Sequence, residues 1–233
     1  KPDRAELDVL DHYMFQNEIQ PVNGTYSFLV YEPALERTHL DEVLLAMIDH
    51  DSDATLAITA DGAVKAINDP HGPASCIHSA GDDVCELVSG MNDGYMLEAG
   101  HNETLTLHFP EMTGSGEVKL VIAHKAIIDL LPFYVWDPRD PIHWKCSIHV
   151  QTLNEQNEWH DFATVPARMN RVVDVVDITP LGDLIAAGQP IRLLITGTHV
   201  IDFIGLDVSE TPELEIEYAS PSFASYFEDP DSP

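Results

Sequence analysis

Short runs of apolar and β-branched residues, separated by turn residues, fill most of the 233-residue chain. Residues 146–151 alternate apolar and polar positions, which is typical of a strand with one buried face. Val118–Ala123 is a compact run of buried-strand length that is apolar except for Lys119. The pattern predicts strands at residues 26–31, 42–48, 55–59, 63–67, 95–98, 104–109, 118–123, 146–151, 158–165, 171–178, 191–196 and 200–204.

Helical patterns are few. Leu181–Ala187 lies between Thr179-Pro180 and Gly188, which are start and stop signals for one or two helical turns. Residues 5–15 have only weak helical spacing. Many short strands joined by turns predict an all-β protein built of antiparallel β-sandwich units, jelly-roll or immunoglobulin-like in type, with few short helices.

A phrase of two strands and a turn occurs twice, in residues 23–45 and 188–207. Asp41 and Asp202 occupy corresponding positions, 202 − 41 = 161 residues apart, which is a domain-sized period. By pattern alone residues 42–48 fit a strand or a helix, and their match to residues 200–204 favours a strand.

The repeated phrase predicts two related modules, with the first incomplete at its start. We therefore expect the closing strands of a first β unit, truncated or completed by another segment, then bridging strands and loops, a β-sandwich module, and a linker or tail. These parts correspond to residues 1–50, 51–115, 116–210 and 211–233. The abrupt start inside a unit suggests a processed chain or a part of a longer polypeptide.

Acidic residues outnumber basic ones by 40 to 11, which gives a formal net charge of −29. Such a field repels nucleic acids and anionic membranes. The acids are spread along a chain of ordinary apolar content, as in a folded protein with an acidic surface. Because salt screens the self-repulsion of such a lysine-poor surface, we favour a halophilic source over an ordinary host or a calcium-binding protein. No apolar run approaches the ~18 residues that span a bilayer, and no signal peptide is visible.

Two parts of the sequence carry a family resemblance. One comprises Tyr31-Glu32-Pro33, residues 36–43 and Ile48-Asp49-His50, and the other is the stretch 118–207, with its strand pair around Trp159. Together they resemble the C-terminal β-sandwich module of large extracytoplasmic surface proteins of archaea and bacteria, which carry tetratricopeptide or propeller-like repeats. The resemblance implies an extracellular or cell-surface location and brings no catalytic residues.

The chain departs from this pattern at two positions. No proline follows Asp49-His50, and Gly197 stands where an aromatic residue or alanine is expected.

Cysteines and glycosylation sequons provide candidate modification sites. Cys76 and Cys85 flank a turn-rich stretch and fit either a local disulfide, which would imply an oxidising compartment, or two buried thiols. Cys146 alternates with apolar neighbours, so we expect it in the core. Asn23 and Asn102 begin N-x-Ser/Thr sequons, which are consistent with secretion although so short a motif also occurs by chance.

Acidic turns are the best candidates for metal ligands. Asp51, Asp53, Asp82 and Asp83 lie in oxygen-rich loops that suit calcium, although a complete calcium-binding loop is missing and we favour a solvated acidic surface. The twelve histidines lack a short metal-ligand spacing, and no catalytic motif is present. We therefore expect no enzyme and no cofactor other than calcium.

Asp41 and Asp202 can be interpreted as calcium or sugar ligands or as structural residues. We favour the structural role, because an aspartate at the start of a strand can accept backbone N–H groups from a neighbouring loop.

Aromatic residues cluster in one proline-rich loop, at Phe133, Tyr134, Trp136 and Trp144. They suit stacking on sugars, cover of a sheet end, or a subunit contact. The function expected from the sequence is a non-catalytic extracytoplasmic structural or adhesive module of a surface protein or filament-like assembly. Its partners would be other copies or domains of the same protein, joined through unpaired strand edges. The alternatives are a carbohydrate-binding module and an accessory subunit of a secreted enzyme.

Overall fold

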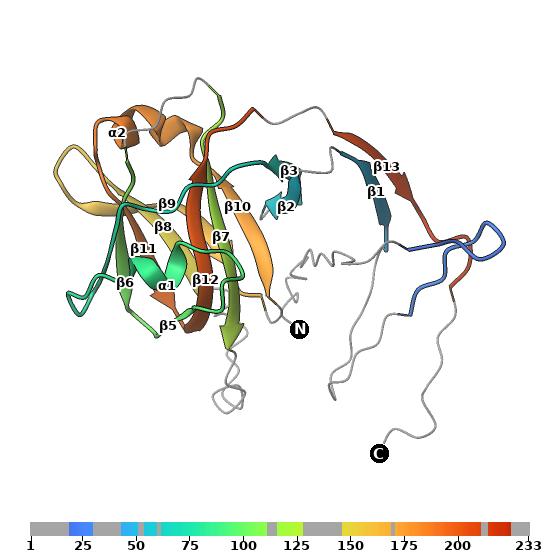
Figure 1. The fold of residues 1–233 in the computed structure, drawn as a ribbon, viewed down its shortest axis with the longest axis horizontal. Helices are drawn as coiled ribbons and strands as arrows, with labels where there is room; N and C mark the ends of the chain where they lie inside the picture. The colour runs from blue at the N-terminus through green and yellow to red at the C-terminus, as the bar shows by residue number, and fades with distance from the viewer. Residues whose placement is uncertain are drawn as a thin grey trace, which may run out of the picture. The chain divides into compact units, whose positions relative to one another are not determined.

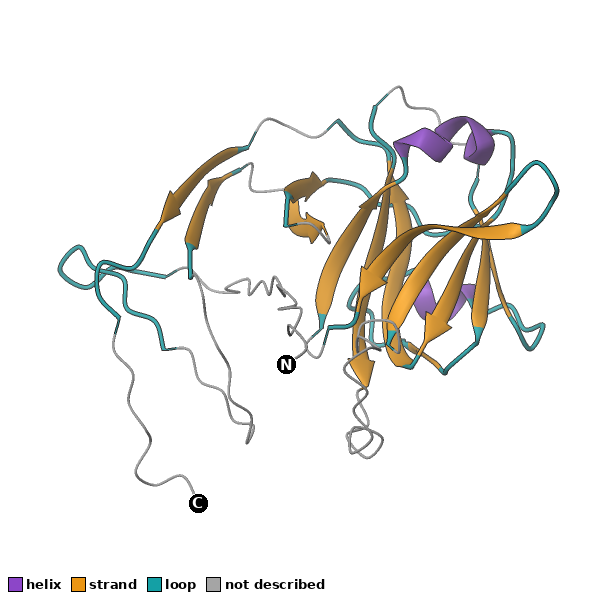
Figure 2. Cartoon of the chain, turned by 180° about the vertical axis from the view of Figure 1, so that it is seen from behind, coloured by secondary structure: helices purple, strands orange, loops and turns teal. Residues whose placement is uncertain are grey.

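The computed structural model of the chain describes residues 19–29, 43–50, 54–59, 62–110, 116–127, 146–168, 171–210 and 214–224 (Figure 1). These residues divide into two units. The larger unit comprises the described residues between 54 and 210, and the smaller one comprises the segments 19–29, 43–50 and 214–224. The larger unit is a sandwich of two β-sheets packed face to face (Figure 2).

The first sheet has six strands in the order β3-β2-β10-β7-β12-β5. They are β2 (Thr55–Thr59), β3 (Val64–Ile67), β5 (Leu97–Ala99), β7 (Lys119–Ile127), β10 (Val172–Asp177) and β12 (Thr198–Asp207). Neighbouring strands are antiparallel except β2 and β10, which pair in parallel. The expectation of antiparallel sheets is therefore confirmed for most pairs but not for this one.

The second sheet has five strands in the order β4-β6-β11-β8-β9, all antiparallel. They are β4 (Ser75–His78), β6 (Thr104–His108), β8 (Ser147–Leu153), β9 (Trp159–Pro166) and β11 (Ile191–Thr196). β8 and β9 form a hairpin whose turn is held by Asn154, since its side-chain oxygen accepts the N–H groups of Gln156 and Glu158.

The main core lies between the two sheets. Strands of the five-stranded sheet alternate, so that Ile191, Leu193 and Ile195 of β11 are buried in it. In contrast, β7 is apolar on both faces: Leu120 and Ile122 belong to the main core, whereas Val121 and Ala123 belong to a smaller cluster. This explains the four successive apolar residues 120–123, because a stretch of strand covered on both faces needs no polar positions.

Helices are short, as the sequence predicts. α1 spans Cys85–Val88, and a 3₁₀ turn at Thr179–Leu181 leads into α2, Gly182–Ala186. Asp177 accepts the backbone N–H of Thr179 at the start of this turn. The chain leaves α2 through Gly188, which has φ of +79°. Glycine adopts this left-handed backbone without the steric cost of a side chain.

A β-bulge interrupts the pairing of β12 with β7 at Asp202. On one side of the bulge His199 and Ile201 face the core, and on the other side Ile204 and Leu206 do. The buried carboxylate of Asp202 accepts the backbone N–H of Asn92 at 3.2 Å and forms an ion pair with Arg171.

The two strands of the repeated phrase do not form a hairpin in the second copy. β11 and β12 follow one another through Gly197, yet they belong to different sheets. The reason is that both edges of β11 are already paired with β6 and β8, and both edges of β12 with β7 and β5. In the first copy residues 26–29 form no strand, and Asp41 lies outside the described residues.

The strands between residues 55 and 108, expected as a bridge between units, contribute to both sheets of the sandwich. β4 and β6 occupy one edge of the five-stranded sheet, and β2, β3 and β5 lie at the two edges of the other.

The smaller unit is a pair of antiparallel strands, β1 (Leu45–Asp49) and β13 (Glu215–Ala219). Its register aligns Leu45 with Ala219 and Asp49 with Glu215. A tight turn at Asn23-Gly24, both with positive φ, is closed by hydrogen bonds between Val22 and Thr25.

A buried ion pair links β7 and β12 where the two strands end together. Lys119 Nζ lies 3.3 Å from Asp207 Oδ2, and both side chains are fully buried. Lys119 also donates to the carbonyl of Ala66, and Asp207 accepts the N–H groups of Asn68 and Ser209. Burial opposes the ionised form of Asp207, but these hydrogen bonds and the ammonium of Lys119 together lower its pKa.

We expect Asp207→Ala to lower the free energy of unfolding by about 3–5 kcal/mol, because it leaves a buried ammonium without its counter-ion. Denaturant titration at fixed salt measures this. Asp69→Ala, which removes a largely exposed carboxylate, is the control and should change stability little. A loss below about 1 kcal/mol for Asp207→Ala would show that the pair is not the constraint described.

Candidate functional site

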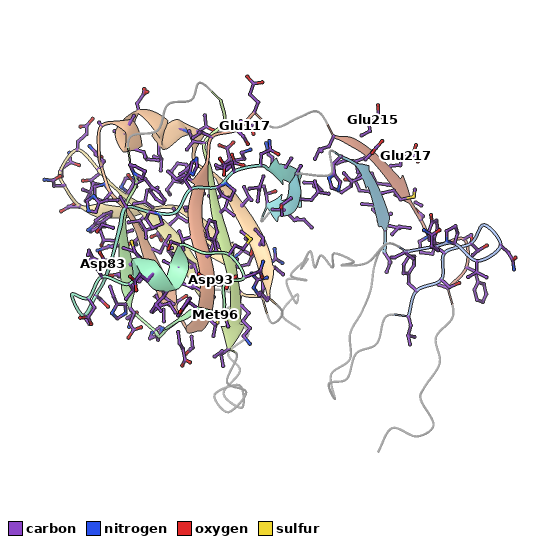
Figure 3. The ribbon with its side chains drawn as sticks, in the orientation of Figure 1. Asp83, Asp93, Met96, Glu117, Glu215 and Glu217 are labelled. Atoms are coloured by element: carbon purple, nitrogen blue, oxygen red, sulfur yellow. The ribbon has the colours of Figure 1, made fainter. Side chains whose placement is uncertain are left out.

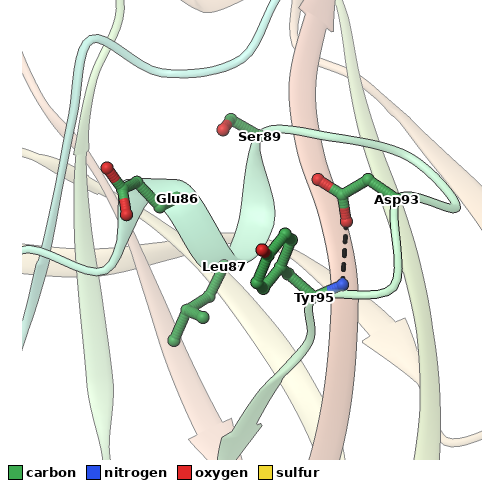
Figure 4. A pocket seen from close by; sticks show the side chains of 5 residues that line it. All are labelled: Glu86, Leu87, Ser89, Asp93 and Tyr95. Carbon is green, nitrogen blue, oxygen red and sulfur yellow. Dashed lines mark hydrogen bonds between the residues drawn. The ribbon is translucent and has the colours of Figure 1, made fainter.

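A shallow pocket lies beside α1, lined by Glu86, Leu87, Ser89, Asp93 and Tyr95 (Figure 4). Asp93 accepts the backbone N–H of Tyr95 at 2.9 Å, which holds the loop that carries both side chains. The ring of Tyr95 is exposed, so the pocket offers an aromatic surface between carboxylates. It is open rather than enclosed, and nothing in it fixes the position of a ligand's reacting atoms.

Asp83 organises the turn between β4 and α1. Its Oδ1 atom accepts the backbone N–H of Cys85 at 3.0 Å and that of Cys76 at 3.4 Å. The hydrogen bond from Cys85 is the main reason that the pKa of Asp83 is lowered. One carboxylate oxygen of Asp83 is thus used by the backbone of β4 and α1, and a role of Asp82 and Asp83 as calcium ligands stays a prediction. Asp51 and Asp53, the other two candidates, lie outside the described residues.

Cys76 and Cys85 are free thiols in the structure, which therefore lacks the disulfide considered from the sequence. The sulfur of Cys85 instead lies 3.5 Å from the carbonyl oxygen of Pro73. Burial, with the negative charges of Cys85 and Asp83, raises the pKa of Cys76 to about 12. Burial and Asp83 raise that of Cys85 to about 11. Both groups are thus protonated and unreactive near neutral pH.

A polar cluster occupies one end of the space between the sheets. His124 on β7 places Nε2 2.9 Å from Asp174 Oδ2 on β10, and its Nδ1 lies 3.3 Å from Nδ1 of His199 on β12. Arg168, which follows β9, forms an ion pair with the same aspartate. His124 and His199 are fully buried and Asp174 nearly so. An ionised carboxylate only accepts, so Nε2 of His124 carries a proton toward Asp174.

Cys146 lies beside this cluster, with its sulfur 3.7 Å from Nε2 of His199. Burial raises the pKa of this thiol, although the backbone N–H of Thr198 opposes the effect. Gly197 packs so closely that an added Cβ would lie 2.6 Å from the sulfur, and its φ is +78°. Its N–H donates to His101 Nδ1 at 3.1 Å. These contacts leave no room for a side chain at position 197.

Burial and the neighbouring His124 lower the pKa of His199 to about 4, from an ordinary value of 6.5. The ring is therefore neutral at neutral pH. A neutral imidazole costs less to bury than an imidazolium, so the cluster is suited to stabilise the fold rather than to exchange protons with solvent.

A second polar network lies on the outer face of the five-stranded sheet. Side chains of β8, β9 and β11 meet there, because the register places Arg192 opposite Gln151, and Gln151 opposite Asp161. Arg192 Nε donates to Gln151 Oε1 at 2.7 Å, and Gln151 Nε2 donates to Asp161 Oδ1 at 2.7 Å. The guanidinium carbon of Arg192 lies 4.4 Å from the centre of the Trp159 ring.

The same network contains a serine, a histidine and an aspartate in contact. His149 Nε2 lies 3.1 Å from Ser147 Oγ, and His149 Nδ1 lies 3.2 Å from Asp161 Oδ2. This is the order of contacts in a serine-hydrolase triad. However, Ser147 is fully buried and its hydroxyl also contacts that of Thr196 at 2.9 Å. A substrate has no approach to this oxygen, so the arrangement holds strands together rather than presenting a nucleophile.

The two sequon asparagines lie in exposed turns. Asn23 has φ of +54° and Asn102 has φ of +65°, and both side chains are accessible. Their use as glycosylation sites stays a prediction. The aromatic residues Phe133, Tyr134, Trp136 and Trp144 lie outside the described residues, so their role in sugar binding also stays a prediction.

Within the described ranges, no group of three or more histidine, cysteine, aspartate or glutamate side chains is arranged to hold a metal ion. None of the described helices is long and apolar enough to cross a membrane. No known protein family, curated protein or solved structure matches the chain.

Sequence reasoning missed both polar networks. The signal for the outer one was available in part: Gln151 is a polar position of an alternating strand, and Arg192 occupies the same kind of position in another. The alternation predicts that each faces away from the core. It does not predict that their strands are neighbours, which depends on contacts between distant parts of the chain.

The shifted pKa of His199 predicts a pH-dependent stability. The folded state binds fewer protons than the unfolded state between about pH 4 and pH 6.5, so the contribution of the neutral ring is complete above pH 6.5 and is lost as the pH falls toward 4. We expect the stability advantage of the unaltered chain over His199→Asn to shrink by up to about 3 kcal/mol across this range. Denaturant titrations of both chains measure it, and an advantage independent of pH would contradict the assignment.

The raised pKa values of Cys76 and Cys85 predict slow alkylation. In a Cys146→Ser background at about pH 8, both thiols should react with iodoacetamide at least about a hundredfold more slowly than free cysteine, and at ordinary rates in denaturant. Mass spectrometry of the labelled peptides measures each rate. Rates in the folded protein within about tenfold of free cysteine, or an intact mass matching a disulfide, would contradict the thiol assignment.

Proposed function

We propose that this chain is a non-catalytic structural or adhesive module of an extracytoplasmic surface protein, and that strands β1 and β13 join it to another copy or module of the same protein. The observation that carries the proposal is the exposure of apolar side chains on the smaller unit. Of the twelve large apolar side chains exposed in the described part of the chain, nine belong to this unit. They are Val22, Tyr26, Phe28, Leu29, Val43, Leu44, Met47, Tyr218 and Phe223.

The pair β1–β13 lacks a core of its own. Among its described residues, and those of segments 19–29 and 220–224, none is buried. Two-stranded ribbons are at best marginally stable in water, because they cannot bury enough apolar surface to offset the loss of chain entropy. A third strand or a covering surface would supply that burial.

Charge on the ribbon adds to the argument. Asp49 lies directly opposite Glu215, and Glu217 projects from the same strand (Figure 3). Like charges at facing positions destabilise a strand pair. High salt screens this repulsion, which agrees with the halophilic source expected from the composition.

Strand addition is the mode of association that fits these features. Each strand of an isolated pair has one edge free for backbone hydrogen bonds, and an extended segment of a neighbouring chain can pair with it. Under this proposal the incomplete first module expected from the sequence is completed by the neighbour. A jelly-roll or immunoglobulin-like type for the completed modules remains part of the proposal, as do a cell-surface location and membership in the group of surface proteins that the sequence resembles.

Self-association at high salt tests the proposal. We expect the chain to form oligomers in about 3 M KCl, and the variant Met47→Lys/Tyr218→Lys to weaken that association at least about tenfold. Analytical ultracentrifugation over a range of protein concentrations measures this. The introduced lysines would place positive charges in the contact between copies, and this burial of charge, rather than a changed fold, would weaken the association.

The sandwich offers a matched control. Met96 and Tyr95 are exposed by 50% and 61%, against 38% and 62% for Met47 and Tyr218. Met96→Lys/Tyr95→Lys should therefore leave association unchanged. A chain that stays monomeric at high salt up to about 1 mM, or a control variant that weakens association equally, would overturn the proposal.

A further inference from the structure

We propose that the outer face of β8, β9 and β11 is a binding site for a neutral oligosaccharide. Trp159 would provide the stacking surface, Arg192 and Asp161 would bind hydroxyl groups, and the buried Gln151 would hold those two side chains in position. This inference supplies an adhesive activity but does not depend on association through β1 and β13.

A β-bulge between β8 and β9 brings the residues of the site to one face of the sheet. The register of β8 with β9 shifts between Val150 and Gln151, so that Gln151 faces Asp161 while Val150 faces Ala163. Phe162 is thereby left as the extra residue and packs against the core. The bulge lets Trp159 and Asp161 share the outer face with Gln151, as bulges commonly redirect side chains near binding sites.

The polar groups are fixed before any ligand arrives. The oxygen of Gln151 accepts from Arg192 and its nitrogen donates to Asp161, so the orientation of the amide is determined. Arg192 in turn stacks on Trp159. All four residues are carried by strands, which are more rigid than loops. A preorganised site loses less conformational entropy on binding.

The network leaves hydrogen-bonding groups available. Arg192 uses its Nε atom for Gln151, and within the described residues neither of its Nη groups has a hydrogen-bond partner. Asp161 accepts two hydrogen bonds, yet its side chain is 53% exposed, so its carboxylate can accept more. A planar donor beside a planar acceptor matches adjacent sugar hydroxyls, each of which both donates and accepts.

Charge argues for a neutral ligand. The chain carries a net charge of −29, which disfavours anionic ligands at long range. At the site itself, the Asp161 carboxylate offsets the positive charge of Arg192. A neutral sugar avoids both penalties, and its C–H groups can pack on the accessible part of the half-buried Trp159 ring, which also carries the guanidinium.

A purely structural role makes a different prediction. β9 is the edge strand of the sheet, and the network from Arg192 through Gln151 to Asp161 ties it to β8 and β11. If that were its whole role, substitutions would lower stability without any ligand being bound.

Titration of a single-tryptophan chain provides the test. The protein has three tryptophans, so Trp136→Phe/Trp144→Phe leaves Trp159 as its sole indole fluorophore. We expect cellohexaose, xylohexaose, mannohexaose or chitohexaose to change its fluorescence with saturation below about 5 mM, whereas oligogalacturonate does not. The same double variant separates this site from the predicted aromatic loop.

Calorimetry on matched variants completes the test. Trp159→Ala should weaken binding of the responding sugar at least about tenfold, and Asp161→Asn, a milder change at a half-exposed position, at least about fivefold, with the fold monitored by circular dichroism. Tyr95→Ala, at the exposed aromatic of the α1 pocket, and Met47→Lys/Tyr218→Lys should leave binding unchanged. No response to any of the four neutral sugars would overturn the proposal. So would Trp159→Ala and Asp161→Asn variants that bind the sugar as tightly as the unaltered chain does.

Discussion

The pairing of β7 with β12 is the constraint on which the sandwich depends. It runs from Thr198 opposite Ile127 to Asp207 opposite Lys119, and both strands are interior strands of the six-stranded sheet. A buried polar contact marks each half: His124 with His199 on one side of the bulge, and Lys119 with Asp207 on the other. Since a buried polar group without a partner is costly, these contacts disfavour any other register of the two strands.

The few lysine and arginine side chains of the chain are used largely in ion pairs with carboxylates. Four of the described cations, Lys65, Lys119, Arg168 and Arg171, form ion pairs with acids that are distant in sequence or lie on another element. Most of these acids are buried. The remaining acids in the described part of the chain are half-buried or exposed, so there the excess of negative charge is carried mainly by groups that water and salt can reach.

The sequence was informative where apolar and polar positions alternate along a strand and where turn residues act locally. Period-two alternation was sufficient for β8 and β11, because each has one face in the core, and Asn154 marked the turn of the β8–β9 hairpin. Which strands pair could not be predicted from local sequence. Nothing local indicates that β11 and β12 separate into two sheets, or that β2 runs parallel to β10. Two successive strands joined by a turn, as in the repeated phrase, suggest a hairpin because neighbouring strands usually pair. The Arg192–Gln151–Asp161 network depends on a β-bulge, and the sequence there has no glycine that would indicate one.

The register of β1 and β13 has a mechanical consequence. Leu45 and Ala219 pair at the end where the chain enters β1 and leaves β13, while Asp49 and Glu215 pair at the end nearest the sandwich in sequence. Tension applied to the flanking segments would therefore open this ribbon like a zipper, one cross-strand pair at a time. Until the last pair parted, the intervening 165 residues or so would form a closed loop that bears no load. In a protein exposed to shear, the two strands of the ribbon would separate under force before the sandwich unfolds, and they would pair again when the force is removed.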